Sequence, residues 1–472
     1  MRLHRVAACS AIALFAISAL CEGNAGISSE LFVQRESNGA TQLFTNLNPD
    51  KTGLSVVNSY EDPRMWTERY QEMVYGTIGT GVAVADYDRD GFPDVFIAVK
   101  TGGSRLYRNR GEMRFEDVTE SAGLIENDDS WSKRITNWFD SDTDEASESW
   151  DQGAVFADVN NDGWLDLFVT SFAAPNRLYI NQGDGTFEEE ADVRGLNLVD
   201  SSGSAAFCDY DRDGWLDVYI QTNISDALAS PEGQPDRLYR NLGDGYFSDV
   251  SNQSGIAGVS AGHSATWWDY DGDLLPDLYV ANDFVNPDKL YRNLGDGTFE
   301  DVLESLVPVM PYYSMGADIG DVNNDGRFDL LVGDMAPSTH EKDQRGMAVS
   351  RAREMGKGLK DVAPQVMRNA LYLNTGTERF LEIASLADVA RTDWTWSVRF
   401  EDLDCDGFVD LHVTNGMVRE YHNADILRKI MGSMNRMGQR GIMRASPLLS
   451  ESNLAFRNLG GLSFERVESS WG

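Results

Sequence analysis

A nine-residue pattern occurs six times in this chain, and its first copy reads Asp86-Tyr87-Asp88-Arg89-Asp90-Gly91-Phe92-Pro93-Asp94. Each copy has Asp at positions one, five and nine, and Asp or Asn at position three. The copies are called loops one to six, and they begin at Asp86, Asp158, Asp209, Asp269, Asp321 and Asp402. Several hard oxygen ligands converging from one tight turn suit Ca²⁺, which takes about six to eight oxygens. The pattern therefore predicts up to six bound calcium ions.

The predicted calcium ligands are the side chains at positions one, three, five and nine of each loop. They are Asp86, Asp88, Asp90 and Asp94; Asp158, Asn160, Asp162 and Asp166; Asp209, Asp211, Asp213 and Asp217; Asp269, Asp271, Asp273 and Asp277; Asp321, Asn323, Asp325 and Asp329; and Asp402, Asp404, Asp406 and Asp410.

The EF-hand begins with a similar loop, but it needs Glu at position twelve and a helix on each side. Position twelve is apolar in all six copies, which have Ile97, Val169, Ile220, Val280, Val332 and Val413 there. The residues after each loop alternate or run apolar, as in Val95-Phe96-Ile97, and this is typical of strands. The loops are therefore predicted to join strands.

Each repeat contains four strand-like segments. In the first repeat, residues 81–85 lead into the loop, an apolar strand follows the loop, Leu106 to Asn109 carry a Leu-Tyr-x-Asn motif, and Phe115 opens the fourth segment after a glycine turn. Four antiparallel strands per repeat, at a spacing of about 50 to 80 residues, are typical of a β-propeller. The prediction is an all-β chain with six calcium-loop blades in a six- or seven-bladed ring.

These motifs resemble the FG-GAP or VCBS repeats of integrin-α-type propellers over nearly everything after residue 43. A narrower similarity, to the cartilage acidic protein and ASPIC-UnbV group, rests on 333–337, 367–371, 392–396 and 413–416. The resemblance implies a calcium-binding propeller. Members of that group usually continue past the strand equivalent to Phe464. The last blade here is therefore expected either to be completed by an N-terminal strand at Phe44, or to remain incomplete, with a partner chain or an open edge beside it.

The expected organisation is an export signal at 1–25, a flexible segment at 26–42 and a propeller at 43–472. Arg2 and Arg5 precede an apolar run that ends at Leu20, and small residues precede Gly26. A lipoprotein modified at Cys21 is an alternative, which Leu20 disfavours. No later segment is long and apolar enough to span a bilayer. The protein is therefore expected to be secreted, periplasmic or attached to the cell surface.

Three insertions are expected at 125–150, 334–365 and 416–452, at the ends of the blades opposite the calcium loops. The second and third are basic, rich in Met and predicted to be helical, although the net charge of the chain is −36. They are either a surface that binds a protein or carbohydrate ligand, or a cover for the propeller channel. Several tryptophans either form a platform for sugars or fill the core, namely Trp131, Trp138, Trp150, Trp267, Trp268, Trp394 and Trp396. The acidic surface argues against a nucleic-acid partner.

The leading interpretation is an exported adhesion or binding module in which calcium is structural. The sequence shows no catalytic triad and no His cluster with metal-ligand spacing. The alternatives are an extracellular polysaccharide lyase or hydrolase, and an incomplete propeller that acts as a subunit. Loops two and five, which have Asn at position three, are expected to bind calcium more weakly. Loop four is expected to bind weakest and to turn differently, because it has Gly272 at position four and Leu274 at position six.

Overall fold

The computed structural model describes residues 43–471 except 59–61, 67–68, 70–80, 125–149, 226–229, 231–232, 257, 284–285, 347–363, 378, 417–418, 421–422, 433–440, 443, 450 and 468–470. The expected signal and flexible segment, and the first insertion up to residue 149, lie outside this part. The chain forms two compact units. Unit 1 comprises Met1–Asn46, Glu304–Arg428 and Ser446–Gly472, and unit 2 comprises Leu47–Leu303 and Lys429–Ala445.

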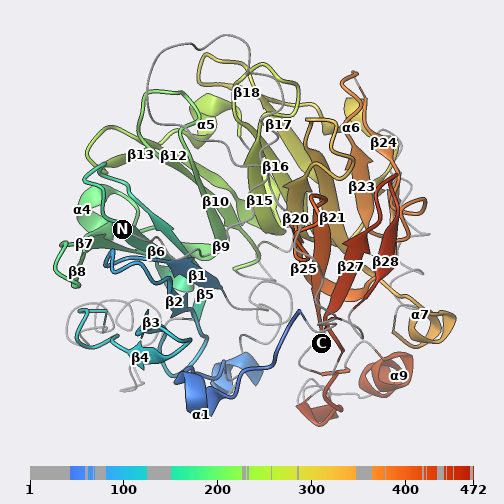
Figure 1. Ribbon diagram of the computed structural model, residues 1–472, viewed down its shortest axis with the longest axis horizontal. Helices are drawn as coiled ribbons and strands as arrows, with labels where there is room; N and C mark the ends of the chain where they lie inside the picture. Colours follow the sequence, from blue (N-terminus) through green and yellow to red (C-terminus); the bar gives the residue numbers. More distant parts are fainter. Residues whose placement is uncertain are drawn as a thin grey trace. The chain divides into compact units, whose positions relative to one another are not determined.

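Unit 2 contains four antiparallel meanders of four strands each, as predicted (Figure 1). They are β1 (Val82–Ala85), β2 (Asp94–Ile97), β3 (Arg105–Asn109) and β4 (Phe115–Asp117); β5 (Trp150–Ala157), β6 (Asp166–Pro175), β7 (Arg177–Asn181) and β8 (Phe187–Glu189); β9 (Val199–Cys208), β10 (Asp217–Thr222), β12 (Arg237–Asn241) and β13 (Phe247–Asp249); and β15 (Gly262–Trp268), β16 (Asp277–Asn282), β17 (Lys289–Asn293) and β18 (Phe299–Asp301). The remaining elements are the short pair β11 (Gln234–Pro235) and β14 (Val259–Ser260), with α1 (Pro49–Thr52), η1 (Pro63–Trp66), α4 (Ala191–Arg194) and α5 (Ser251–Ser254).

Unit 1 contains two further meanders of the same kind. They are β20 (Ser314–Gly320), β21 (Asp329–Ala336), β23 (Ala370–Leu373) and β24 (Leu381–Glu382), and β25 (Asp393–Glu401), β26 (Asp410–Asn415), β27 (Leu454–Asn458) and β28 (Phe464–Arg466). β19 (Met310–Pro311) pairs in parallel with β22 (Gln365–Val366), and α7 (His340–Gly346) follows β21. The chain passes between the units within α6 (Leu303–Leu306) and α9 (Ala424–Gly432). α7 and α9 lie in the second and third expected insertions.

The strand register places each calcium loop and the next glycine turn at the same end of its sheet. In the first meander Ala85 pairs with Asp94 across the loop, and Asn109 pairs with Phe115 across the turn. The prediction that each loop joins two strands is therefore correct. Two boundaries differ from the expectation, because Trp150 and residues 334–336 were assigned to insertions but belong to β5 and β21.

The core lies between neighbouring sheets. In unit 2, Phe96 and Leu106 of the first meander pack with Leu167 and Val169 of the second. The first strands of the second and third meanders also approach closely, since a Cβ on Gly153 of β5 would lie 2.8 Å from the carbonyl oxygen of Gly203 in β9. This close approach leaves no room for a side chain at Gly153. The all-β, propeller-type fold predicted from the sequence is confirmed.

The segment that begins at Leu43 is not a strand, contrary to the expectation. The backbone N–H of Phe44 nevertheless donates to the carbonyl oxygen of Trp471 (2.8 Å), and its ring packs against Trp471 and His412, all within unit 1. Among the described residues, no helix has both the length and the apolar character that a bilayer span requires.

Candidate metal centres

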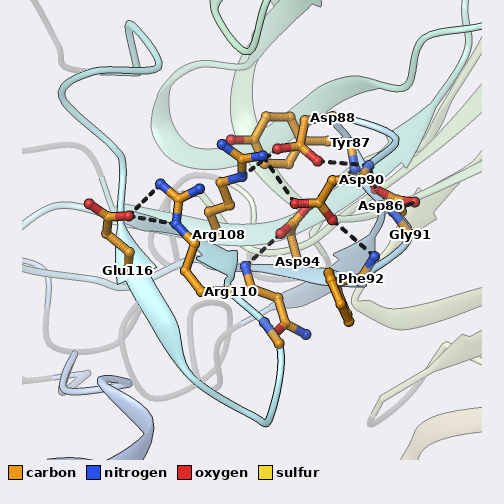
Figure 2. A network of polar contacts seen from close by, with 12 residues as sticks. Asp86, Tyr87, Asp88, Asp90, Gly91, Phe92, Asp94, Arg108, Arg110 and Glu116 are labelled. Carbon is orange, nitrogen blue, oxygen red and sulfur yellow. Dashed lines mark hydrogen bonds and ion pairs between the residues drawn. The ribbon is translucent and has the colours of Figure 1, made fainter.

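Loop one is held as a tight turn by its own carboxylates (Figure 2). The two oxygens of Asp86 accept the backbone N–H groups of Asp90 (3.0 Å) and Gly91 (2.9 Å). Asp88 Oδ1 accepts the N–H of Asp90 (3.2 Å), and Asp90 Oδ1 accepts that of Phe92 (3.0 Å). These bonds span at most five residues, which is why the nine-residue pattern alone specifies the turn.

The other loops repeat this arrangement. In all six, the position-one carboxylate accepts the N–H of position six at 2.8–3.0 Å. The predicted ligands converge: carboxylate oxygens of three residues lie within 4.8 Å of one another in the groups Asp86, Asp88 and Asp94; Asp209, Asp211 and Asp213; Asp269, Asp271 and Asp273; and Asp402, Asp404 and Asp410. These belong to the four loops that have Asp at position three.

The six position-nine aspartates have a distinct role, because they tie each loop to the third strand of its sheet. One oxygen accepts the N–H of the Asn that ends that strand or directly follows it (2.7–2.9 Å), and the other accepts the N–H of position two (2.9–3.3 Å). They are Asp94, Asp166, Asp217, Asp277, Asp329 and Asp410, and each is at most 1% exposed.

Burial is the largest cause of a raised pKa in all six position-nine aspartates, and neighbouring loop carboxylates add to it. Against the lowering effect of the hydrogen bonds, the pKa of each is raised to about 7. Carboxylates crowded in this way repel one another unless a cation lies among them. In loop six, Asp404 Oδ1 is buried and has no hydrogen-bond partner among the described residues. A set of hard oxygen donors of this kind fits Ca²⁺.

An arginine from the third strand lies against loop one. Arg108 Nε is 2.5 Å from Asp88 Oδ2, and its Nη2 is 3.0 Å from Asp90 Oδ2 (Figure 2). The fork of the guanidinium group thus engages positions three and five together. Equivalent arginines occur in loops three, four and six, and they were not singled out from the sequence.

Loop four does not turn differently, so this expectation is wrong. Positions four and six have positive φ in every loop, for example Arg89 (58°) and Gly91 (91°) in loop one. Loop four keeps the same conformation with Gly272 at 79° and Leu274 at 69°. The only change in its hydrogen bonding to position one is that Asp269 Oδ1 accepts the N–H of Gly272 (2.8 Å), one residue earlier than in the other loops. Leu274 is therefore a strained residue in an otherwise standard loop.

The Asn of Leu-Tyr-x-Asn connects one calcium loop to the loop of the preceding repeat. Asn241 Nδ2 donates to the Val159 carbonyl in loop two (2.9 Å) and to the Leu216 carbonyl in its own loop (3.1 Å). Three other asparagines make the same link to position two of the preceding loop: Asn181 to Tyr87, Asn293 to Tyr210 and Asn458 to Val322. The sequence showed the motif but not this function.

A buried polar cluster in unit 2 was not foreseen. Lys100 is completely buried, and its Nζ donates to the Asp151 carbonyl (3.1 Å) and to Gln152 Oε1. Burial lowers the pKa of Lys100 to about 7, although the Asp151 carboxylate opposes this. Asp151 also accepts from Ser104 and Arg177. Lys100 follows an apolar strand, and nothing in its local sequence indicates burial.

Unit 1 has a concave pocket in the insertions. It encloses about 520 Å³, including the part open to solvent. Apolar side chains of Met335, Pro337, Trp394 and Leu449 line it, together with the charged residues Lys342, Arg345, Asp393, Arg419, Glu420 and Glu451. This pocket lies where the sequence analysis expected a ligand surface.

Several of the tryptophans and one histidine considered as ligand-site candidates are packed among other side chains. Trp150 and Trp268 are 2% and 5% exposed, and Trp267 stacks on Tyr210. These tryptophans fill the core, whereas Trp131 and Trp138 lie outside the described residues. Burial lowers the pKa of His412, which packs against Phe44. Cys208 is a free thiol, so it is not bonded to Cys405.

The four-stranded repeats and their loops agree with what comparison with known proteins finds. A model of the FG-GAP-like repeat matches residues 158–220 and 269–332, and both matches begin at position one of a loop. The chain thus contains FG-GAP-like repeats within an all-β fold of the propeller type.

The chain also resembles cartilage acidic protein 1. It is 25% identical to the Homo sapiens protein over 213 residues, which are 44% of this chain and 28% of that protein, and 25% identical to the Mus musculus protein, of which 29% is covered. The matched part is thus under a third of the length of these relatives.

Solved structures with a similar arrangement are more distant in sequence. An Agrocybe aegerita lectin that recognises non-reducing terminal N-acetylglucosamine has a TM-score of 0.41 at 15% identity, with 83% of both chains covered. The BBS1N structure in complex with ARL6DN has a TM-score of 0.39 at 11% identity, with 72% of this chain and 76% of that chain covered.

Proposed function

We propose that this protein is an exported binding or adhesion module whose propeller blades are stabilised by calcium. The observation that carries the proposal is the common hydrogen-bonding scheme of the six loops. In each, a buried position-nine carboxylate connects the loop to the third strand, so a cation held there would fix the first three strands together. Calcium in this role is structural, and folding becomes dependent on the metal.

The charge balance supports this proposal. The net charge of −36 opposes compaction, and six calcium ions would offset twelve of those charges. Carboxylates at positions one, three, five and nine would hold each ion, with Asn at position three in loops two and five. The start of the sequence, with its basic residues and apolar run, supports export.

The pocket in unit 1 is the proposed ligand site. Its apolar wall suits an apolar side chain of a protein ligand, and its charged rim contains three cationic and three acidic side chains. Hydrogen bonds already engage its carboxylates. Asp393 accepts from Ser338 and Lys342, and Glu451 accepts from Lys342 (2.7 Å). Groups held in this way suit recognition better than the proton transfers of a polysaccharide lyase or hydrolase.

Two experiments test the proposal. Thermal unfolding of the purified protein should show a clear rise in Tm with calcium over chelator, since each site held at about 100 times its Kd adds about 2.7 kcal/mol. A calcium-independent Tm would contradict the structural role of the metal.

For the ligand site, the protein is screened against a panel of purified extracellular proteins and an array of defined glycans. Leu449→Asp, in the pocket, should abolish protein binding, whereas the control Leu459→Asp, at an exposed turn of the same unit, should not. Binding of a glycan alone would replace the protein ligand, and cleavage of a polysaccharide in a parallel assay would contradict the non-catalytic assignment.

A further inference from the structure

The residue before the Asn in Leu-Tyr-x-Asn varies together with position three of the loop. Loops one, three, four and six have Asp at position three, and their third strands carry Arg108, Arg240, Arg292 and Arg457. Loops two and five have Asn160 and Asn323 at position three, and their third strands carry Ile180 and Leu373 instead. The two positions therefore change together in all six repeats.

The arginine contacts are alike in loops one, three and six, whereas in loop four the same nitrogen of Arg292, Nη2, contacts Oδ2 of both Asp271 (2.8 Å) and Asp273 (3.5 Å). In loop three, Arg240 Nε is 2.6 Å from Asp211 Oδ2, and its Nη2 is 2.9 Å from Asp213 Oδ2. In loop six, Arg457 makes the same two contacts with Asp404 and Asp406 at 2.7 and 2.9 Å. In each case the arginine binds the Oδ2 atoms of positions three and five.

In the two loops without a third-strand arginine, the position-three amide donates to the Oδ2 atom of position five. In loop two, Asn160 Nδ2 donates to Asp162 Oδ2 (3.0 Å), and in loop five Asn323 Nδ2 donates to Asp325 Oδ2 (3.1 Å). The position-five Oδ2 that accepts from arginine in loops three and six thus accepts from the position-three amide here. The third-strand residue is then free to be apolar, and Ile180 is only 5% exposed within the core of unit 2.

Both arrangements give the same charge over the four ligand positions and the third-strand residue. Over these five positions, loop three has four aspartates and Arg240, for a sum of −3, and loop two has three aspartates and Ile180, which is also −3. Arg212, at position four of loop three, is not a ligand position and is not counted in this sum. Loop five has the same ligand set as loop two, but Arg327 at its position seven also binds Asp325 (2.6 Å). Loops two and three are therefore compared over these five positions.

We propose that position three and the third-strand residue form a matched pair, Asp with Arg or Asn with an aliphatic residue, which keeps the summed charge of the ligand positions and the third-strand residue constant and orients the position-five carboxylate for a divalent cation. The proposal deepens the calcium-binding function and rests on it. It replaces the expected ranking, because Asn at position three is compensated by the loss of the arginine charge. Arg240 is thus a positioning residue for the metal site.

The alternative is that each arginine makes an ordinary surface ion pair. Exposed pairs of that kind contribute little to stability and would not change a metal affinity in a compensated way. The matched-pair proposal instead requires coupling between the two positions, and a double-mutant cycle measures such coupling directly.

The test uses four forms of the whole protein: the wild type, Asp211→Asn, Arg240→Ile, and the double variant, whose loop three has the residues of loop two at both positions. The Tm of each is measured in chelator and in saturating calcium, and each is titrated with Ca²⁺. Arg240→Ile should lower the Tm in chelator, because a sum of −4 is left, and raise the calcium affinity of that loop on the order of tenfold. Asp211→Asn should lower that affinity by a similar factor.

The double variant should return both the Tm in chelator and the calcium affinity close to the wild-type values. If the two changes are simply additive in chelator, the matched-pair proposal is wrong, whatever calcium does. If the wild type does not respond to calcium, the proposed function fails instead, and the cycle in chelator still decides whether the pair is coupled. Coupling in chelator without any effect on calcium affinity would also overturn the proposal, because the pair would then serve the fold alone.

Discussion

Replacement of Leu274 by Gly should stabilise the protein, although Gly usually destabilises. Leu274 is the residue at position six of loop four, where the other five loops have Gly, and its φ is 69°. A residue with a Cβ in the left-handed region costs about 1–2 kcal/mol. Replacing Leu by Gly removes this cost, but about 0.5–1 kcal/mol of the gain is offset because Gly loses more backbone entropy on folding. Because Leu274 is 70% exposed, little apolar burial is lost. The net gain should be about 0.5–1 kcal/mol.

The assay is urea denaturation in saturating calcium, with the matched control Leu242→Gly. Leu242 is 64% exposed and is not among the residues with positive φ, so the same chemical change there should destabilise by about 0.5–1 kcal/mol. A relaxed loop four should also bind calcium more tightly in a titration of Leu274→Gly. If both variants lose the same stability, the assignment of strain to Leu274 is wrong, and an unchanged calcium affinity would show that the strain does not affect the metal site.

Three further predictions follow from the buried groups. Asn241→Ala should destabilise by about 2–4 kcal/mol in urea denaturation, because it leaves the Val159 and Leu216 carbonyls without their amide donor; a loss below about 0.5 kcal/mol would contradict the link between loops. The six position-nine aspartates have a folded pKa of about 7, above the ordinary 3.8, so between these pH values the folded state binds more protons than the unfolded state. In chelator the Tm should therefore fall as the pH rises from about 4 to 7. A rise in Tm over this range would contradict the raised pKa. The folded pKa of Lys100 is lowered to about 7 from 10.5, so its burial destabilises the wild type most below pH 7. The Tm of Lys100→Met in calcium should therefore exceed that of the wild type most below pH 7, and the difference should shrink towards pH 10. A difference in Tm that does not depend on pH would contradict the burial of a charged amine.

The sequence alone predicted those features whose interactions are local. Asp86 bonds to N–H groups four and five residues away, so its role is legible in a nine-residue pattern. The apolar residue at position twelve, such as Ile97, separated these loops from EF-hands and placed them between strands. Repetition then gave the four-stranded blade, because six copies show the same order of elements.

Features that depend on distant segments were not predictable in this way. Asn241 reaches Val159, which lies 82 residues earlier, and Lys100 reaches Gln152 only because two sheets pack together. The conformation of loop four was mispredicted because the loop keeps the same turn as the other loops and tolerates backbone strain at Leu274. The pairing of Arg240 with Asp211 differs from these cases, since the covariation of the two positions across six repeats was present in the sequence and could have been found there.

The central claim is that the six loops are calcium sites that hold the blades together. Isothermal titration of metal-free protein with Ca²⁺, with Tm followed at each step, tests it most directly. The account predicts binding of up to six ions per chain, with the rise in Tm following occupancy. No bound calcium even at a large excess of Ca²⁺, or calcium binding that leaves the Tm unchanged, would contradict the central claim.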